Sequence, residues 1–145
     1  MIVSIIKATS DQDIQTCLNI RFQIFVQGQQ VPIDEEIDGK DKESTHFLLC
    51  LDDHPAGTAR VRVMENVAKI ERVAILDEFQ GKGLGQELML FILTEVQQHT
   101  SVKKIKLSAQ TYVIPFYEKL GFKVCSDEYM DAGIPHQDME LHVSK

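Results

Sequence analysis

Apolar and polar positions alternate along several short stretches of this chain, and a period of two residues is typical of half-buried strands. The first stretch surrounds Val3 and Ile5, and a long β-branched run extends from Val67 to Ile75. Turn-forming residues at positions 52–55 predict a hairpin between strands at residues 46–51 and 56–64. Further strands are predicted at residues 104–108, 122–124 and 138–143.

Apolar residues at helical spacing predict three helices between these strands. The first spans residues 11–27, and Thr9, Ser10 and Asp11 offer side chains that can cap its N-terminus. The second has apolar positions from Leu84 to Val96, and the third spans residues 113–120 before Gly121. Antiparallel strands in series, followed by strand, helix, strand and helix, predict an α+β domain with a mixed, mostly antiparallel sheet flanked by helices.

The hexapeptide Gln80-Gly81-Lys82-Gly83-Leu84-Gly85 joins the strand that ends at Ile75 to the second helix. Glycines allow a positive φ and let a ligand approach without meeting a Cβ atom, while the first turn of a helix has free N–H groups. This arrangement predicts an anion site, most often for phosphate or pyrophosphate. The glycine spacing fits neither the Walker loop nor the dinucleotide fingerprint. A tight turn that only caps a core helix is the alternative interpretation.

Three landmarks together resemble the GNAT superfamily of acyl-CoA-dependent N-acetyltransferases. Residues 80–85 match its Q/R-x-x-G-x-G/A signature, the strand before them contains residues 72–75, and residues 115–122 read Pro-Phe-Tyr-Glu-Lys-Leu-Gly-Phe. Two segments resemble the bacterial ElaA/YjcF-like branch of this superfamily. They are the sequence from Phe25 to Pro32, which acidic residues follow, and the loop at residues 131–136. The resemblance implies an acetyl-CoA co-substrate and direct acetyl transfer to a small-molecule or peptide primary amine.

The resemblance also implies where acetyl-CoA binds. Backbone N–H groups from Gly81 to Gln86 would hold the pyrophosphate, with Gln80 and Lys82 as supporting side chains. The pantetheine arm would lie along the strand at residues 73–75, where a backbone N–H would polarise the thioester carbonyl. The cofactor-binding residues expected from this comparison are Val73, Ala74, Ile75, Gln80, Gly81, Lys82, Gly83, Leu84, Gly85 and Gln86.

Tyr117 matches the tyrosine that usually protonates the departing CoA thiolate in this family, although it could instead be a helix tyrosine that packs beside Phe116. For the general base, period two puts Glu71 on the same strand face as Val73 and Ile75, which would direct its carboxylate into the cleft. An ion pair between Glu71 and an arginine of the neighbouring strand, Arg60 or Arg62, is an equal alternative, and a water chain could relay the proton.

The resemblance implies that the first helix flanks the acceptor cleft, so Arg21 is a candidate substrate contact. It also implies that the connection after this helix lines the acceptor side, which makes Glu35 and Glu36 candidates. Loops on a rigid scaffold commonly carry specificity. The alternatives are a salt-bridged or exposed Arg21 and a solvated acidic face over residues 34–43. His136 is a further candidate because histidine titrates near neutrality, with bracing of its own loop as the alternative.

Composition narrows the functional class. The 145 residues predict one domain, 1–145, with 43% hydrophobic residues. The formal charge of −7 argues against non-specific nucleic-acid binding and suits a cationic or neutral substrate. Residues 1–6 are too short for a signal peptide or a membrane span, which favours a cytoplasmic enzyme.

Cysteine and histidine spacing predicts neither a disulfide framework nor a metal site. Cys17, Cys50 and Cys125 lie far apart, and the five histidines form no ligand pattern. A homodimer is compatible with the sequence. The functional alternative to an enzyme is an acyl-CoA-binding regulatory module that keeps the glycine loop without significant turnover.

Overall fold

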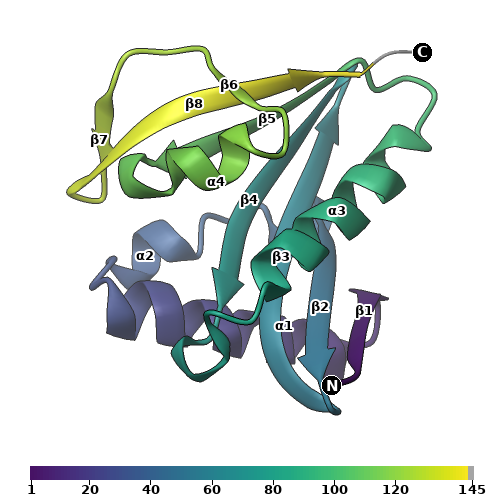
Figure 1. Ribbon diagram of the computed structural model, residues 1–145. Helices are drawn as coiled ribbons and strands as arrows, with labels where there is room; N and C mark the ends of the chain where they lie inside the picture. Colours follow the sequence, from purple (N-terminus) through teal and green to yellow (C-terminus); the bar gives the residue numbers. More distant parts are fainter. Residues whose placement is uncertain (144–145) are drawn as a thin grey trace.

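The computed structural model describes residues 1–143 and contains an eight-stranded sheet in the order β1-β2-β3-β4-β5-β8-β6, with β7 paired to β8 (Figure 1). Every pairing is antiparallel except that of β4 with β5. The predicted α+β class with a mixed sheet is therefore confirmed. The strands are β1 (Val3–Ala8), β2 (Thr45–Leu51), β3 (His54–Met64), β4 (Val67–Ile75), β5 (Lys104–Gln110), β6 (Lys123–Val124), β7 (Tyr129–Asp131) and β8 (Ile134–His142).

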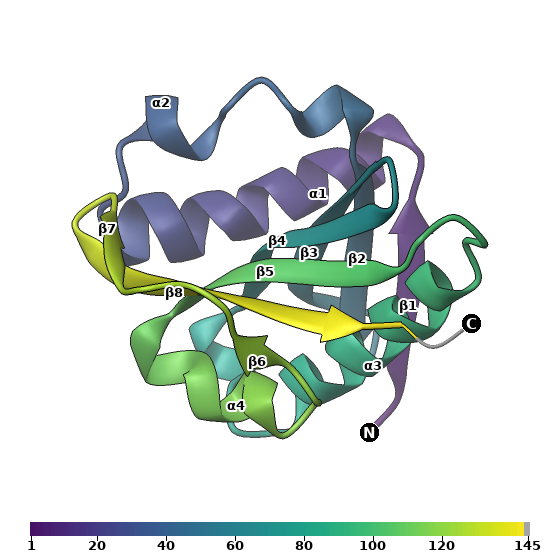
Figure 2. The ribbon, with the colours of Figure 1, turned by 90° about the horizontal axis from the view of Figure 1, so that it is seen from above.

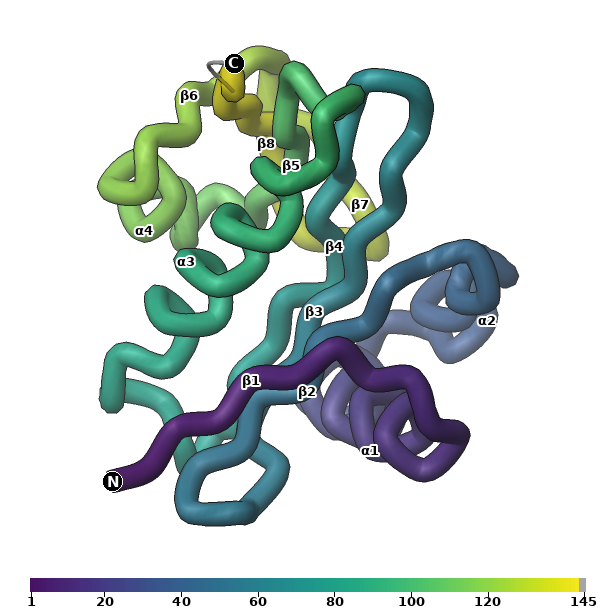
Figure 3. Tube along the Cα trace, turned by 90° about the vertical axis from the view of Figure 1, so that its right-hand side faces the viewer, coloured from purple at the N-terminus to yellow at the C-terminus, as the bar shows by residue number. Residues whose placement is uncertain are grey.

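Helices cover both faces of the sheet. The helices α1 (Asp11–Arg21) and α2 (Ile33–Glu36) lie on one face, and α3 (Leu84–Gln97) and α4 (Ile114–Glu118) lie on the other (Figures 2 and 3). The predicted cap is present, because the Ser10 hydroxyl accepts a hydrogen bond from the backbone N–H of Asp13 at 3.1 Å. No helix within residues 1–143 is long and apolar enough to cross a membrane.

Two apolar clusters fill the space between the sheet and these helices. On the α3 side, Leu88 and Ile92 pack with Phe47 and Ile70 in the larger cluster. On the α1 side, Cys17 and Ile20 pack with sheet residues in the smaller cluster. The period-3.6 and period-2 patterns of the sequence thus correspond to the buried faces of these elements.

In three segments the structure differs in kind from the prediction. The helix expected over residues 11–27 changes at Phe22 into a π-helix, Phe22–Gly28. The loop expected after it contains α2 and a 3₁₀ turn, Asp41–Glu43. The loop expected at residues 131–136 is the turn of the β7–β8 hairpin, where Ala132 and Gly133 both have positive φ, as a two-residue type I′ turn requires.

A bulge in β4 corrects the predicted strand faces. Thr58 of β3 is opposite Ala74, but Arg60 is opposite Glu71, so β4 has one residue more than β3 over this interval. Arg72 takes up the extra residue with a left-handed φ of 57°. Period two breaks there, and the expectation that Glu71 shares a face with Val73 and Ile75 was wrong. Val73 and Ile75 pack on the α3 side, whereas the Glu71 carboxylate faces Arg60.

Candidate active site

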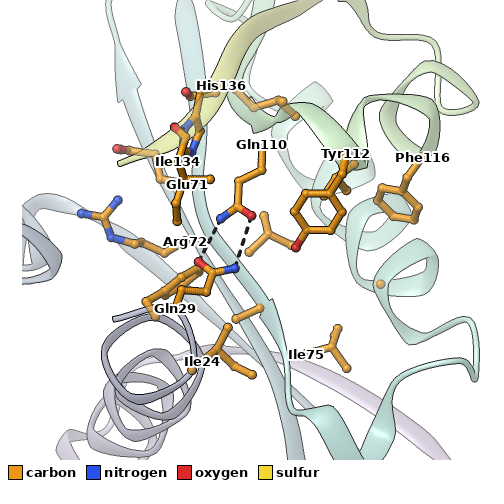
Figure 4. Close-up of a pocket in the computed structure, with 18 of the residues that line it drawn as sticks. Ile24, Gln29, Glu71, Arg72, Ile75, Gln110, Tyr112, Phe116, Ile134 and His136 are labelled. Carbon is orange, nitrogen blue, oxygen red and sulfur yellow. Dashed lines mark hydrogen bonds between the residues drawn. The ribbon is translucent and has the colours of Figure 1, made fainter. Parts of the chain in front are cut away.

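A cleft of about 920 Å³ opens beside the parallel β4–β5 ladder, whose last paired residues are Ile70 and Leu107. Beyond that point the facing edges of β4 and β5 are not paired with each other, and an unpaired strand edge can hydrogen-bond an extended ligand. The cleft is lined by the end of the π-helix and α2, by β4, the start of α3, α4, the end of β5 and the β7–β8 hairpin, and Figure 4 labels ten of the lining residues.

The glycine turn borders the α3 end of this cleft. Gly81 and Gly83 have φ values of 79° and 78°, and a Cβ atom added to either would meet nothing within 4 Å. Gly85 is helical, and its added Cβ would meet the Phe116 ring at 3.6 Å, so only two of the three glycines are required by a positive φ. The first N–H groups of α3 start here, as an anion site needs.

The other residues expected to bind acetyl-CoA have two different surroundings. Gln80 lines the cleft, but its side-chain amide donates to the Ile75 carbonyl at 3.0 Å and so braces the turn. Lys82 is exposed and is not one of the lining residues. The lining positions among those expected from the sequence are Val73, Ala74, Ile75, Gln80, Gly81, Gly83, Leu84, Gly85 and Gln86.

Tyr117 lies on α4 with only 8% of its surface exposed and lines the cleft. Its ring makes edge contacts with Phe116 and Phe122, at centroid distances of 5.1 and 6.1 Å. Burial raises the pKa of the Tyr117 phenol to about 12, because the charged form is poorly solvated. The hydroxyl therefore keeps its proton throughout the neutral range, as a proton donor must.

Glu71 lines the cleft but is held by two arginines of β3. Arg62 Nε donates to Glu71 Oε1 at 2.5 Å, and Arg60 Nη2 donates to Oε2 at 3.1 Å. Burial alone would raise the pKa of the Glu71 carboxyl, but the two guanidinium groups outweigh it and the pKa lies below its ordinary value. Of the two readings of Glu71, the ion pair is the one present in the structure.

The candidates Arg21 and Glu36 form part of the same buried ionic network. Arg21 is fully buried and binds Glu36 and Asp41, so the expectation that Arg21 faces substrate was wrong. Glu36 also pairs with Arg72 at 2.7 Å, and Asp41 pairs with Arg60 at 2.9 Å. This network fastens the segment between α1 and β2 to the sheet. Both acidic candidates line the cleft, Glu35 as an exposed residue and Glu36 as a buried member of this network.

His136 lines the opposite part of the cleft and stacks on Tyr129, with ring centroids 6.0 Å apart. Its Nδ1 lies 2.7 Å from the Ile134 carbonyl, which can only accept, so Nδ1 carries a hydrogen and, in the neutral ring, Nε2 has the lone pair. The Tyr129 hydroxyl donates to Asp138 at 2.5 Å and shares a hydrogen bond with Ser108. His136 thus braces its loop and also faces the cleft.

Several polar lining residues were not predicted from the sequence. Gln29, Gln110, Ser108 and Tyr129 come from elements far apart in the chain, and no local motif contains them. Tyr129 lies in β7, which has three residues, all exposed, and is too short to show an alternating pattern. Within residues 1–143, no group of three or more histidine, cysteine or carboxylate side chains is arranged to hold a metal.

A family model described as "Acetyltransferase (GNAT) domain" matches residues 7–143. The Bacillus subtilis protein YjcF, described as an uncharacterized N-acetyltransferase, is 34% identical over 133 residues, which cover 91% of this chain and 94% of YjcF. The crystal structure of Escherichia coli ElaA has a TM-score of 0.84 at 27% identity and covers 95% and 97% of the two chains. A Pseudomonas aeruginosa acyl-CoA N-acyltransferase has a TM-score of 0.84 at 25% identity, with the same coverage.

Proposed function

The chain belongs to the GNAT acetyltransferase family, and from that premise we propose that it transfers an acetyl group from acetyl-CoA to a primary amine. The observation that carries the proposal is the cleft beside the β4–β5 ladder. It connects the glycine turn at the start of α3 and Tyr117 on one face of the sheet with polar side chains on the other. A thioester and an amine can therefore approach each other from opposite faces.

On the α3 side, the turn at residues 81–86 would bind the pyrophosphate of acetyl-CoA. Open space at Gly81 and Gly83 leaves room for phosphate oxygens, and the helix N-terminus contributes partial positive charge. The pantetheine arm would pair with the β4 edge at residues 73–75, which is not bonded to β5. Backbone pairing of this kind depends little on side-chain identity.

The reaction needs one bond to form and one to break. The amine nitrogen attacks the thioester carbonyl carbon, the C–S bond breaks, and the CoA thiolate leaves. A backbone N–H of residues 73–75 would stabilise the negative charge that develops on the carbonyl oxygen, an effect of about 2.7–4 kcal/mol where it has been measured by mutation. Tyr117 would donate its proton to the thiolate as the C–S bond breaks.

The attacking amine must also lose a proton, and two side chains were candidates for accepting it. Glu71 is poorly suited, because Arg60 and Arg62 stabilise its charged form and weaken it as a base. We assign proton removal to His136 Nε2, directly or through water, because Nδ1 is already bonded to the Ile134 carbonyl. Glu71 would instead hold β3 against the bulge of β4.

Calorimetric titration with acetyl-CoA and a thiol-release assay with a panel of amines test this proposal together. Binding with amine-dependent thiol release supports acetyl transfer. Binding without turnover on any amine would identify an acyl-CoA-binding regulatory module instead. No binding at millimolar acetyl-CoA would contradict both functions. The small-molecule or peptide nature of the acceptor, a homodimer and a cytoplasmic location stay predictions.

A further inference from the structure

Two glutamine side chains form a reciprocal amide pair in the cleft. Gln29 follows the π-helix, and Gln110 is the last residue of β5, 81 positions later. Gln29 Nε2 donates to Gln110 Oε1 at 3.2 Å, and Gln110 Nε2 donates to Gln29 Oε1 at 2.9 Å (Figure 4). Both side chains are half-buried and both line the cleft.

The pair lies on the side of the cleft that faces away from the glycine turn. Along β5, Leu107 and Ala109 point into the core on the α3 side, so Ser108 and Gln110 point to the α1 side. Gln29 reaches the same place from the end of the segment that starts with α1. On the proposed chemistry, this is where the group next to the acceptor amine must lie.

Hydrogen-bonding capacity indicates what this pair can bind. Each primary amide has two N–H donors and two acceptor positions, and the reciprocal pair uses one of each. What remains on each glutamine is one donor and one acceptor without any charge. A ligand amide has a carbonyl acceptor and an N–H donor, so it can bind the remaining positions or replace one partner of each glutamine. An apolar amine or a simple ester cannot satisfy both.

Nearby charges discriminate against a carboxylate at this position. Glu35 and Asp131 are exposed carboxylates in the cleft lining. Of the two lining cations, Arg72 is engaged by Glu36 and Asp38. The other, Lys69, lies where β4 is still paired with β5. The exposed carboxylates of the lining therefore outnumber Lys69, the lining cation that Glu36 and Asp38 do not engage, which disfavours a negatively charged group beside the amine.

We propose that Gln29 and Gln110 select an acceptor whose primary amine is next to a neutral amide, such as the α-amino group of a peptide or of an amino-acid amide. This inference rests on the proposed acetyl transfer and narrows its substrate class. A site that hydrogen-bonds a substrate group discriminates against analogues that lack this group, because the remaining donor or acceptor of each glutamine is then left without a partner.

The kinetic test compares kcat/KM for alaninamide with that for alanine methyl ester, which keeps the carbonyl but lacks the N–H donors. We expect wild type to prefer the amide by about tenfold or more, corresponding to one well-formed hydrogen bond. In Gln29→Leu and in Gln110→Leu the preference should fall to about twofold or less. Gln15→Leu is the matched control, because the Gln15 side-chain amide donates a hydrogen bond to Asn19 on the exposed face of α1, away from the cleft. This variant should keep the preference.

A second measurement remains informative if a leucine variant fails to fold or if no amine is turned over. In wild type saturated with CoA, the side-chain NH₂ resonances of Gln29 and Gln110 are followed by NMR during titration. Alaninamide should shift both and alanine methyl ester should shift them less. Selective shifts without turnover of any amine would refute acetyl transfer but support amide recognition by Gln29 and Gln110. Equal turnover of amide and ester, or shifts that do not distinguish them, would refute amide recognition but leave the proposal of acetyl transfer standing.

Discussion

Arg60 and Glu71 are opposite each other in the β3–β4 register, and Arg60 Nη2 donates to Glu71 Oε2 at 3.1 Å. Arg60 is fully buried, and Arg62 holds the second oxygen of the same carboxylate. Glu71 is one of three carboxylates around Arg60, with Asp38 and Asp41, and it is the nearest carboxylate to Arg62. Its removal leaves two buried guanidinium groups with less compensation, which destabilises the fold. The pair therefore fixes Glu71 as part of the frame around the cleft.

This relationship predicts the behaviour of Glu71→Gln. The variant should unfold at a lower temperature and should lose kcat by a similar factor at every pH, because a structural ion pair does not depend on the protonation state of the amine. Activity profiles and thermal unfolding between pH 6 and pH 10, roughly the range where amines and histidine titrate, check this. A loss confined to low pH would identify Glu71 as the base after all.

His136→Asn should have the complementary effect. The loss of kcat should be large where the acceptor amine is protonated and small where the amine deprotonates unaided, since only the proton acceptor has been removed. Tyr129→Phe is the structural control, because it keeps a ring for His136 to stack on while removing the bond to Asp138. A pH-independent loss in His136→Asn would reduce His136 to a residue that braces its loop.

Tyr117→Phe should reduce kcat by roughly 10²–10⁴-fold with little change in acetyl-CoA affinity. The ring keeps its contacts with Phe116 and Phe122, so packing should survive. The loss should shrink with a thioester whose leaving thiol is more acidic. Since the pKa of Tyr117 is raised to about 12, ionisation of this phenol should not lower wild-type activity at pH values well below 12. Wild-type turnover in the variant would make Tyr117 a packing residue.

The segment between α2 and β2 should loosen at acid pH. Hydrogen bonds from Arg60 lower the pKa of Asp38 below its ordinary 3.8, so the ionised form stabilises the fold fully above that value. This stabilisation is lost as the pH falls through the lower folded-state pKa. Asp38→Asn should cost about 1–3 kcal/mol near neutrality, and its difference from wild type should narrow below roughly pH 4.

Thermal unfolding from pH 7 to pH 2 measures that difference for Asp38→Asn, and Asp34→Asn, at an exposed position of α2, is the matched control. We expect the control to follow wild type at every pH. A difference between Asp38→Asn and wild type that persists unchanged at the lowest pH would refute the contribution of the charged pair.

The strand, turn and helix around Gly81 and Gly83 could be predicted because both the alternation of β4 and the φ > 0 of these glycines have local sequence signals. The side of the sheet on which the Glu71 side chain lies could not be predicted. The bulge that determines it is made by Arg72, and arginine is not a residue type that indicates a left-handed φ. The change to a π-helix at Phe22 could not be predicted either, because it leaves the apolar spacing of the helix intact.

Contacts that depend on the tertiary fold had no signal at all. Gln29 and Gln110 meet only because the end of the π-helix is folded against the end of β5. Arginine usually occupies exposed positions of a helix, yet Arg21 is buried beneath the segment that contains its partners Glu36 and Asp41. The acceptor side of the cleft is therefore where sequence reasoning was least complete, because it is assembled from distant segments.

Gly85→Val tests whether the start of α3 binds acetyl-CoA. A helical φ makes valine acceptable there for the backbone, but its side chain would project near Phe116 and narrow the cleft. We expect calorimetry to show a Kd for acetyl-CoA at least tenfold higher in Gly85→Val than in wild type. Leu90→Val is the control, because it introduces the same β-branched residue on the exposed face of the same helix. Equal affinities in both variants would remove the turn from the binding site.

The most direct test of the central claim follows the acetyl group itself. Purified protein is mixed with acetyl-CoA and alaninamide, and mass spectrometry measures acetylated amine while a thiol reagent measures CoA. Acetyl transfer predicts that the two products appear together in equal amounts, at a rate proportional to protein concentration and strongly reduced in Tyr117→Phe. If acetyl-CoA binds but neither alaninamide nor any amine of the panel gains an acetyl group, the account of this chain as an N-acetyltransferase is contradicted.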